Sequence, residues 1–253
     1  MSKYSKGTTH KTNQGYEIRV IKDISPTRKV VKFLDEHGYM TEIPTSSIAR
    51  GSIKNPFHPS LLGRGFVGVG IYNSKDREYQ LWKTVLNNVY NAKSKKVKLC
   101  KEWHNFQTFA KDINELYGFD LKDKEGRFYN LSKDIISSKK KIYSKKTCVF
   151  IPPEINAFLN HNKQKEGGLP TGVKYRHQDR RYEAKMNICG RSKYISSGLT
   201  IELMRQLYIN ARNKRARELA EVYKGKVDSR VIDFLLNYNE TNQSKESVNW
   251  FVL

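Results

Sequence analysis

One stretch of the sequence, residues 129–156, constrains the fold more than any other. A polar cluster from Ser132 to Asp134 closes a first apolar run, a lysine-rich segment follows, and a second apolar run ends at Pro152 and Pro153. Short apolar runs between polar breaks are typical of strands, and proline is tolerated in the first turn of a helix. The pattern therefore predicts a strand, a basic loop, a strand and a short helix.

Two residues of this stretch have side chains that suit a divalent cation. Asp134 follows the first predicted strand, and Asn156 lies in the first turns of the predicted helix, with Asn160 one turn further on. Carboxylate and amide oxygens are ligands for hard ions such as Mg²⁺, which can stabilise charge on a scissile phosphate. The order matches a one-metal nuclease finger. The alternatives are a helix-capping role for Asn156 and an exposed hairpin charge for Asp134.

The charge of the chain indicates a polyanionic partner. Lys and Arg number 47 against 25 acidic residues, which gives a net charge of +22 and a pI near 9.8 in 253 residues. Nucleic acid is the expected partner of so basic a chain, rather than a membrane surface. No apolar run approaches the ~18–20 residues of a membrane span, so no membrane partner is expected. The widely spaced Cys100, Cys148 and Cys189 argue against a zinc knuckle and favour a reduced, cytoplasmic protein.

Residue patterns divide the chain into segments and predict an α+β fold. Period-two alternation from Tyr16 to Ile43 predicts a small antiparallel β-unit of about three strands, and apolar spacing predicts helices around residues 79–89 and 106–116, with Asn105 as an N-cap. The predicted segments are a basic flexible tail (1–14), the β-domain (15–56), a Gly/Pro connector (57–75), a finger domain (76–162) and a sheet-helix domain with a C-terminal extension (163–253).

The C-terminal segment is predicted to be a three-stranded sheet packed on a long helix. Residues 172–196 alternate with turn residues, and Thr200 is placed to cap the helix that follows. Sixteen basic and six acidic residues fall within 163–226, and nine basic and three acidic within 122–148. The expected nucleic-acid contacts are Lys139, Lys140, Lys141, Lys145, Lys146, Arg176, Arg180, Arg181, Lys185, Arg191 and Lys193. Arg212, Lys214, Arg215 and Arg217 either contact nucleic acid as well or form a solvated helix face.

Taken together, these motifs resemble the HNH-like endonucleases that occur in phage genomes as free-standing homing genes. In that family the finger reads roughly Leu-Asp-Lys-Asp-Ile-Leu, a Gly-Asn-Lys turn, Tyr-Ser-Pro-Glu-Thr-Cys, and Phe-(Val/Ile)-Pro ahead of Ile-Asn. The segments from Tyr79 to Trp82 and from Glu102 to Phe106 are similar to its helical shoulder. Gly-Val-Lys-Tyr at residues 172–175 resembles the start of the DNA-binding domain of plant ethylene-response factors. The resemblance covers roughly residues 12–225.

The resemblance implies a ββα-metal finger that cleaves duplex DNA with Mg²⁺ or another divalent cation, in a phage-infected bacterial cell. It implies that Lys133, Asp134 and Asn156 form the catalytic site, with the metal held by Asp134 and Asn156. Lys133 with Lys139–Lys141 would grip phosphates. The C-terminal sheet would then read base edges in the major groove.

The sequence departs from the family at the catalytic positions. Ser132 stands where the family carries the first Asp of its motif, Lys139–Lys141 replaces the Gly-Asn-Lys turn, and no histidine lies between His104 and His161. His104 is either a base that folds back onto the finger or a structural residue beside Trp103. The alternative function is a catalytically silent protein that binds DNA or RNA, in a regulatory, packaging or ribosome-associated role. An enzyme acting on a small metabolite is disfavoured, since the chain has no phosphate loop or cofactor motif.

Overall fold

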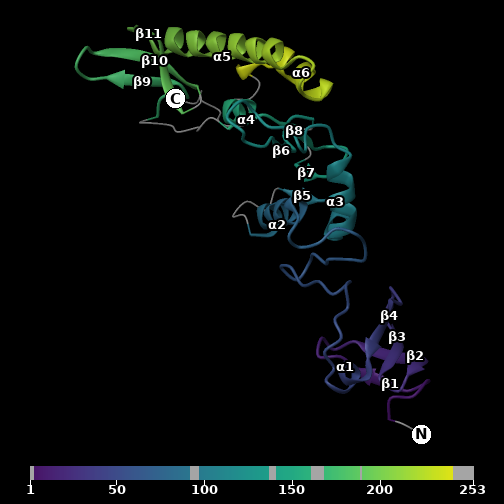
Figure 1. Cartoon of the computed structure of the whole chain (residues 1–253). Helices are drawn as coiled ribbons and strands as arrows, with labels where there is room; N and C mark the ends of the chain where they lie inside the picture. The colour runs from purple at the N-terminus through teal and green to yellow at the C-terminus, as the bar shows by residue number, and fades with distance from the viewer. Residues whose placement is uncertain (1–2, 92–96, 137–140, 161–167, 189, 242–253) are drawn as a thin grey trace. The chain divides into compact units, whose positions relative to one another are not determined.

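The computed structural model describes residues 3–91, 97–136, 141–160, 168–188 and 190–241. The chain divides into two compact units, Met1–Asp112 and Ile113–Leu253. Figure 1 labels the helices and strands. In chain order the elements are β1 Thr9–Lys11, β2 Glu17–Ser25, β3 Arg28–Phe33, β4 Met40–Pro44, α1 Thr45–Ala49, α2 Arg77–Tyr90, β5 Lys98–Leu99, the 3₁₀ turn η1 Glu102–His104, α3 Phe106–Asn114, β6 Asn130–Ser132, β7 Ile142–Tyr143, β8 Val149–Ile151, α4 Pro153–Leu159, β9 Val173–Arg176, β10 Arg181–Ile188, β11 Arg191–Gly198, α5 Ile201–Tyr223 and α6 Ser229–Leu236. This mixture of helices and small separate sheets confirms the predicted α+β class.

An antiparallel sheet in the order β1-β2-β3-β4 begins the first unit. Alternate side chains of β2 and β3 are buried on one face, as their period-two pattern predicted. The buried core residues of this sheet are Ile18, Val20, Val31, Phe33, Ile48 and Ile53. The predicted β-unit was one strand short, because residues 9–11 form the edge strand β1.

The prediction of a flexible tail is therefore wrong for residues 9–11. Thr9 pairs with Arg19 and Lys11 pairs with Glu17 on β2. Opposite charges at directly paired positions stabilise a sheet by roughly 0.2–1 kcal/mol. The strand was missed because its side chains are polar and show no apolar alternation.

Two predicted helices, α2 and α3, follow the connector. Residues 57–75 contain turns and no helix or strand, as predicted for the connector. Trp82 of α2 is fully buried and donates from its indole nitrogen to the Trp103 carbonyl at 2.8 Å. The Asn105 side chain accepts from the Gln107 backbone N–H at 2.9 Å, which confirms the predicted N-cap of α3. Gly68 has a φ of +73° and lies against this cap, where a Cβ would come within 2.3 Å of the Asn105 side-chain oxygen.

The two strands and the short helix predicted within residues 129–156 are present as β6, β8 and α4. Strands β6 and β8 pair antiparallel, with Asn130 opposite Ile151 and Ser132 opposite Val149, and α4 follows directly. All three residues of β8 are buried. Lys139 and Lys140 of the basic loop lie outside the described residues. The short strand β7 lies between the loop and β8, and it was not predicted.

The C-terminal sheet has the order β11-β10-β9 and packs on α5, as predicted. Its buried core consists of Val173, Ala184, Met186, Met204 and Tyr208. Gly172, with a φ of +85°, allows this close approach, because a Cβ there would come within 2.1 Å of the Tyr208 ring. Thr200 occupies the N-cap position of α5, although its side chain makes no capping hydrogen bond.

Helix α6 was not predicted separately within the C-terminal extension. Asp228 caps it by accepting from the Arg230 backbone N–H at 3.0 Å, and the helix packs against α5. Among the described residues, none of the helices is long and apolar enough to cross a membrane.

Candidate finger site and nucleic-acid interface

Asp134 follows the first finger strand and already has a cationic partner. Its carboxylate accepts from the Lys133 ammonium at 2.8 and 2.9 Å. The same ammonium lies 5.4 Å from the centre of the Tyr143 ring, and the Lys133 side chain is only 12% exposed. Exposed ion pairs contribute only about 0–1 kcal/mol. Because Asp134 is half exposed, another cation could displace Lys133 from its carboxylate at little cost. The Lys133 ammonium, however, does not extend into solvent as a phosphate-binding group would.

Asn156 lies inside α4 rather than at its end. Pro152 occupies the N-cap position, so the capping alternative for Asn156 is wrong. The Asn156 side-chain oxygen accepts from the Asn160 amide at 2.9 Å. The two amides share one face of the helix, as predicted from their spacing. The oxygen that would bind a metal is thus already engaged within the helix.

Ser132, the position at which the resembled family carries an aspartate, is buried. It is 8% exposed and pairs with Val149 across the two finger strands. Its hydroxyl oxygen lies 3.4 Å from the Asp134 backbone N–H. Burial disfavours a charged side chain at this position, and serine avoids that cost.

These positions do not fit a preformed magnesium site. Asp134 bonds to its neighbour Lys133 in the turn after β6, Asn156 bonds to Asn160 at the C-cap of α4, and Ser132 supplies no charge. Within the described ranges, no three His, Cys, Asp or Glu side chains gather as a metal-binding group. His104 is committed elsewhere in the first unit: its Nδ1 donates to the Lys101 carbonyl at 3.1 Å, which leaves Nε2 to accept from the Tyr90 hydroxyl at 2.5 Å. The structural alternative for His104 is favoured by these bonds.

The remaining lysines of the finger differ in their surroundings. Lys141 and Lys146 are exposed. Lys145 forms an ion pair with Glu115. The Lys146 carbonyl accepts from the Arg230 guanidinium at 3.4 Å, which ties the finger to the start of α6. Lys141 and Lys146 are therefore the two exposed lysines among the described residues of this predicted set in the finger.

The open face of the C-terminal sheet is the face that does not pack on α5. Strand register places Arg176 opposite Arg181 on this face, and Lys185 opposite Tyr194. Tyr194 is 54% exposed. Residues that pair directly across strands project to the same side, so these four side chains form one surface across β9, β10 and β11.

An acidic residue at the centre of this face was missed by the sequence analysis. Glu183 is almost fully buried and accepts from the Arg176 guanidinium at 2.7 Å and from the Lys185 ammonium at 2.6 Å. These hydrogen bonds, the Lys185 bond first, lower the pKa of the Glu183 carboxyl. Arg176 also meets Asp179 at 3.2 Å. The predicted basic surface of the sheet therefore has an acidic residue at its centre.

The other sheet cations predicted to bind nucleic acid are divided between two faces. Arg181 is exposed on the open face, and Arg180 lies in the turn before it with a φ of +52°. Register pairs Lys193 with Met186 and Arg191 with Ile188, which places both on the same side of the sheet as the apolar core. The structure therefore brings Arg176, Arg181 and Lys185 together and separates Lys193 and Arg191 from them.

Two of the α5 cations form internal contacts instead of a basic surface. Arg212 is 1% exposed and its guanidinium lies 3.8 Å from the centre of the Phe158 ring. It donates to the Phe158 carbonyl at 2.8 Å, the Tyr238 hydroxyl at 3.0 Å and the Glu240 carboxylate at 3.3 Å. Burial raises the pKa of the Tyr238 hydroxyl above its ordinary value. The interpretation of Arg212 as a nucleic-acid contact is wrong, whereas Lys214 and Arg217 are exposed.

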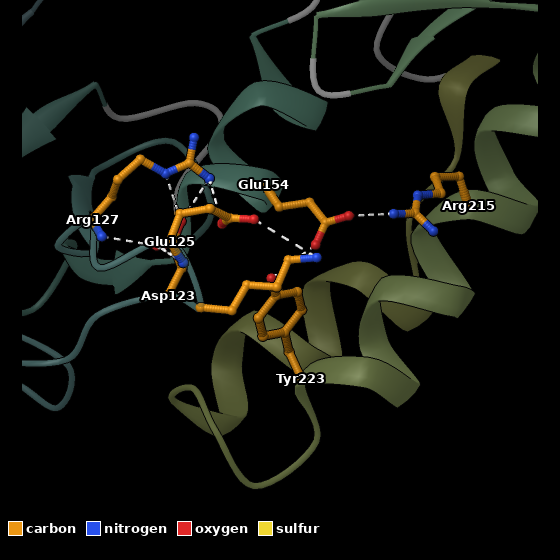
Figure 2. Close-up of polar contacts among 7 residues, drawn as sticks. Asp123, Glu125, Arg127, Glu154, Arg215 and Tyr223 are labelled. Carbon is orange, nitrogen blue, oxygen red and sulfur yellow. Dashed lines mark hydrogen bonds and ion pairs between the residues drawn. The ribbon is translucent and has the colours of Figure 1, made fainter.

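Arg215 is the second of the four α5 cations considered in the sequence analysis that forms internal contacts. Figure 2 shows the Glu154 side chain extending toward Arg215, with Tyr223 also beside it. Glu154 forms an ion pair with Arg215 and accepts from the Tyr223 hydroxyl at 2.8 Å. Burial, followed by the hydrogen bond to Glu154, raises the pKa of Tyr223. Arg215 is 20% exposed and therefore serves mainly within the protein.

The turn before β6 lies in the same view. Asp123 and Arg127 form an ion pair at 2.6 Å (Figure 2). Burial would raise the pKa of Asp123, but the hydrogen bonds from Arg127 outweigh it and lower the pKa.

Compared with known proteins, the chain matches no family model, no curated protein and no solved structure.

Proposed function

We propose that this protein binds duplex DNA through the open face of its C-terminal sheet, with the finger contributing contacts to phosphates. The observation that carries the proposal is the alignment of Arg176, Arg181 and Lys185 on one face of a sheet supported from behind by α5. Sheets of this size can enter the major groove, where arginine pairs with guanine more often than any other combination. Cations aligned on a supported sheet are what such a contact requires.

The two arginines of this face have different environments, and we assign them different roles. Arg176 is held by Glu183 and Asp179, and a guanidinium fixed in one orientation suits recognition of a base edge. Arg181 is exposed and forms no ion pair with another described residue. A mobile exposed cation suits a phosphate, whose charge is the same at every sequence.

The experiment compares three single variants of the full chain on duplexes selected from a random-sequence pool. Arg176→Ala should cost about 1–3 kcal/mol at one base position and relax selectivity there. Arg181→Ala should weaken binding to all sequences alike. The slope of log K against log salt concentration should become less negative by about 0.9, the value for one lost phosphate contact. Lys193→Ala, on the other side of the sheet, is the matched control for selectivity. Affinity for duplex DNA that hardly changes with salt would refute the proposal.

The second candidate is the homing endonuclease that the finger resembles. It is supported by the β6–β8–α4 arrangement, with Asn156 inside the helix that follows the strand pair. The test is incubation with plasmid DNA in magnesium and in chelator. Magnesium-dependent cleavage that Asn156→Ala abolishes would favour this candidate over a protein that only binds.

A further inference from the structure

The long helix α5 is shared between the sheet and the finger. Its first half packs on the sheet through Met204 and Tyr208. Its second half carries Arg212, Arg215 and Tyr223 at spacings of three and eight residues, which places them on one side of a helix. With 23 residues, α5 is roughly 35 Å long at 1.5 Å per residue, long enough to serve both partners.

The second half of α5 holds both ends of the finger helix α4. At the start of α4, Glu154 pairs with Arg215 and Tyr223. At its end, the Phe158 carbonyl accepts from Arg212 at 2.8 Å. Because Arg212 is almost fully buried, water does not compete for this bond and α4 is fixed at two points rather than one.

Strand β10 completes the junction. Asn187 and Ile188 line a space of about 10 Å³ together with Glu154, Phe158 and Leu219. A space of that size has room for at most one water. The sheet, α5 and the finger helix are thus packed against one another, although the sequence pattern placed a domain boundary between residues 162 and 163.

We infer that Glu154 is a positioning residue: through Arg215 and Tyr223 it fixes α4 relative to the sheet, so the finger and the sheet contact DNA at a constant spacing. This inference rests on the proposed DNA binding. Two modules on a flexible tether would produce a range of spacings, whereas modules packed on one helix produce a single one. Glu154 touches no DNA in this scheme and acts through the placement of α4.

The experiment is a hydroxyl-radical footprint of the full chain, in chelator, on a duplex recovered from a random-sequence pool. The native protein should protect two tracts at one separation. Glu154→Lys reverses the charge that holds α4 and adds a cation to the finger, so electrostatics alone would strengthen the finger tract. We expect that tract to be lost or blurred while the sheet tract stays. The pair Glu154→Lys with Arg215→Glu should restore the original separation.

Glu218→Lys is the matched control, because Glu218 carries the same charge change on α5 and also pairs with Arg215, at 3.0 Å. It should leave both tracts in place. Hydrogen exchange of the free variants gives a second readout: Glu154→Lys should speed exchange in α4 and spare the sheet-facing half of α5. An unchanged finger tract in Glu154→Lys would overturn the positioning role alone. Failure to recover any duplex would overturn the DNA binding and the spacing together, whatever the exchange data show.

Discussion

Replacing the buried Arg212 should be among the most destabilising single changes in the second unit. The guanidinium is 1% exposed and serves three partners, while its acidic partner Glu240 is 2% exposed. Arg212→Ala leaves the Glu240 carboxylate buried, supported by the Tyr238 hydroxyl at 2.5 Å and by Arg205 at 3.8 Å. It also removes the donor to the Phe158 carbonyl.

The magnitude follows from these contacts. Removing one member of a buried ion pair costs about 3–5 kcal/mol. Arg205 remains within ion-pair distance, so we expect the lower end, about 3 kcal/mol. With a urea dependence of about 2 kcal/mol per molar, the midpoint should fall by about 1.5 M. Replacing both charges, as Arg212→Met with Glu240→Leu, should cost only about 1 kcal/mol, the value of the lost bond to the carbonyl.

The assay is urea unfolding of the full chain in a Trp250→Phe background. The two remaining tryptophans, Trp82 and Trp103, belong to the first unit, so their fluorescence reports the first unit separately from the second. Circular dichroism at the helix band reports the helices of both units, and the transition of the second unit is measured from this signal. A loss below about 1 kcal/mol in Arg212→Ala, or a double variant as unstable as the single one, would refute the reasoning.

Three further changes test other parts of the chain. Ser132→Asp puts a carboxylate at a buried position, so the melting temperature of this variant should fall in chelator and recover with magnesium. The melting temperature of the native protein should respond little to magnesium. Equal melting temperatures of the variant in chelator and in magnesium would contradict a recoverable metal site. The hydrogen bonds from Lys185 and Arg176 lower the pKa of Glu183 in the folded protein below its unfolded value. The contribution of Glu183 to folding stability is therefore complete above the ordinary pKa of 4.5 and is lost as pH falls through the folded value. In Glu183→Gln that acid-side loss of stability, measured by urea unfolding across pH, should disappear, and binding to unselected DNA should tighten; an unchanged acid limb would contradict it. Burial raises the pKa of the Cys100 thiol to about 11, so alkylation at pH 8, followed by mass spectrometry, should be much slower in the native than in the unfolded protein, and equal rates would contradict the burial.

The elements that sequence patterns predicted are those with strong local signals. The finger strands are short apolar runs between polar residues, β10 of the C-terminal sheet alternates with period two, and Asn105 marks the start of α3. Strand β1 was missed because pairing with β2, not its own composition, makes it a strand. The roles of Asp134 and Asn156 as metal ligands stay predictions, and each side chain bonds to a neighbour close in sequence, Lys133 and Asn160.

The internal role of Arg212 was present in the sequence as a periodic signal. Met204, Tyr208, Arg212 and Ala216 are spaced by four, so the arginine continues an apolar stripe rather than a polar one. A cation inside such a stripe indicates a buried ion pair. Its acid partner, Glu240, lies 28 residues further on, and no local pattern connects the two.

Net charge over a window of sequence therefore overstates the basic surface of this protein. The window 163–226 includes Arg212 and Arg215, which hold the finger helix, and Arg176 and Lys185, which Glu183 partly neutralises. A cation that is bonded to a buried acid gains little from a phosphate, because it must first give up that bond. In the proposed DNA complex, the cations that contact phosphates and give the sequence-independent part of the affinity should then be the exposed ones with no internal acid, such as Arg181. For a chain of +22, the location of the interface follows from which cations the fold leaves exposed, not from where the basic residues are densest along the sequence.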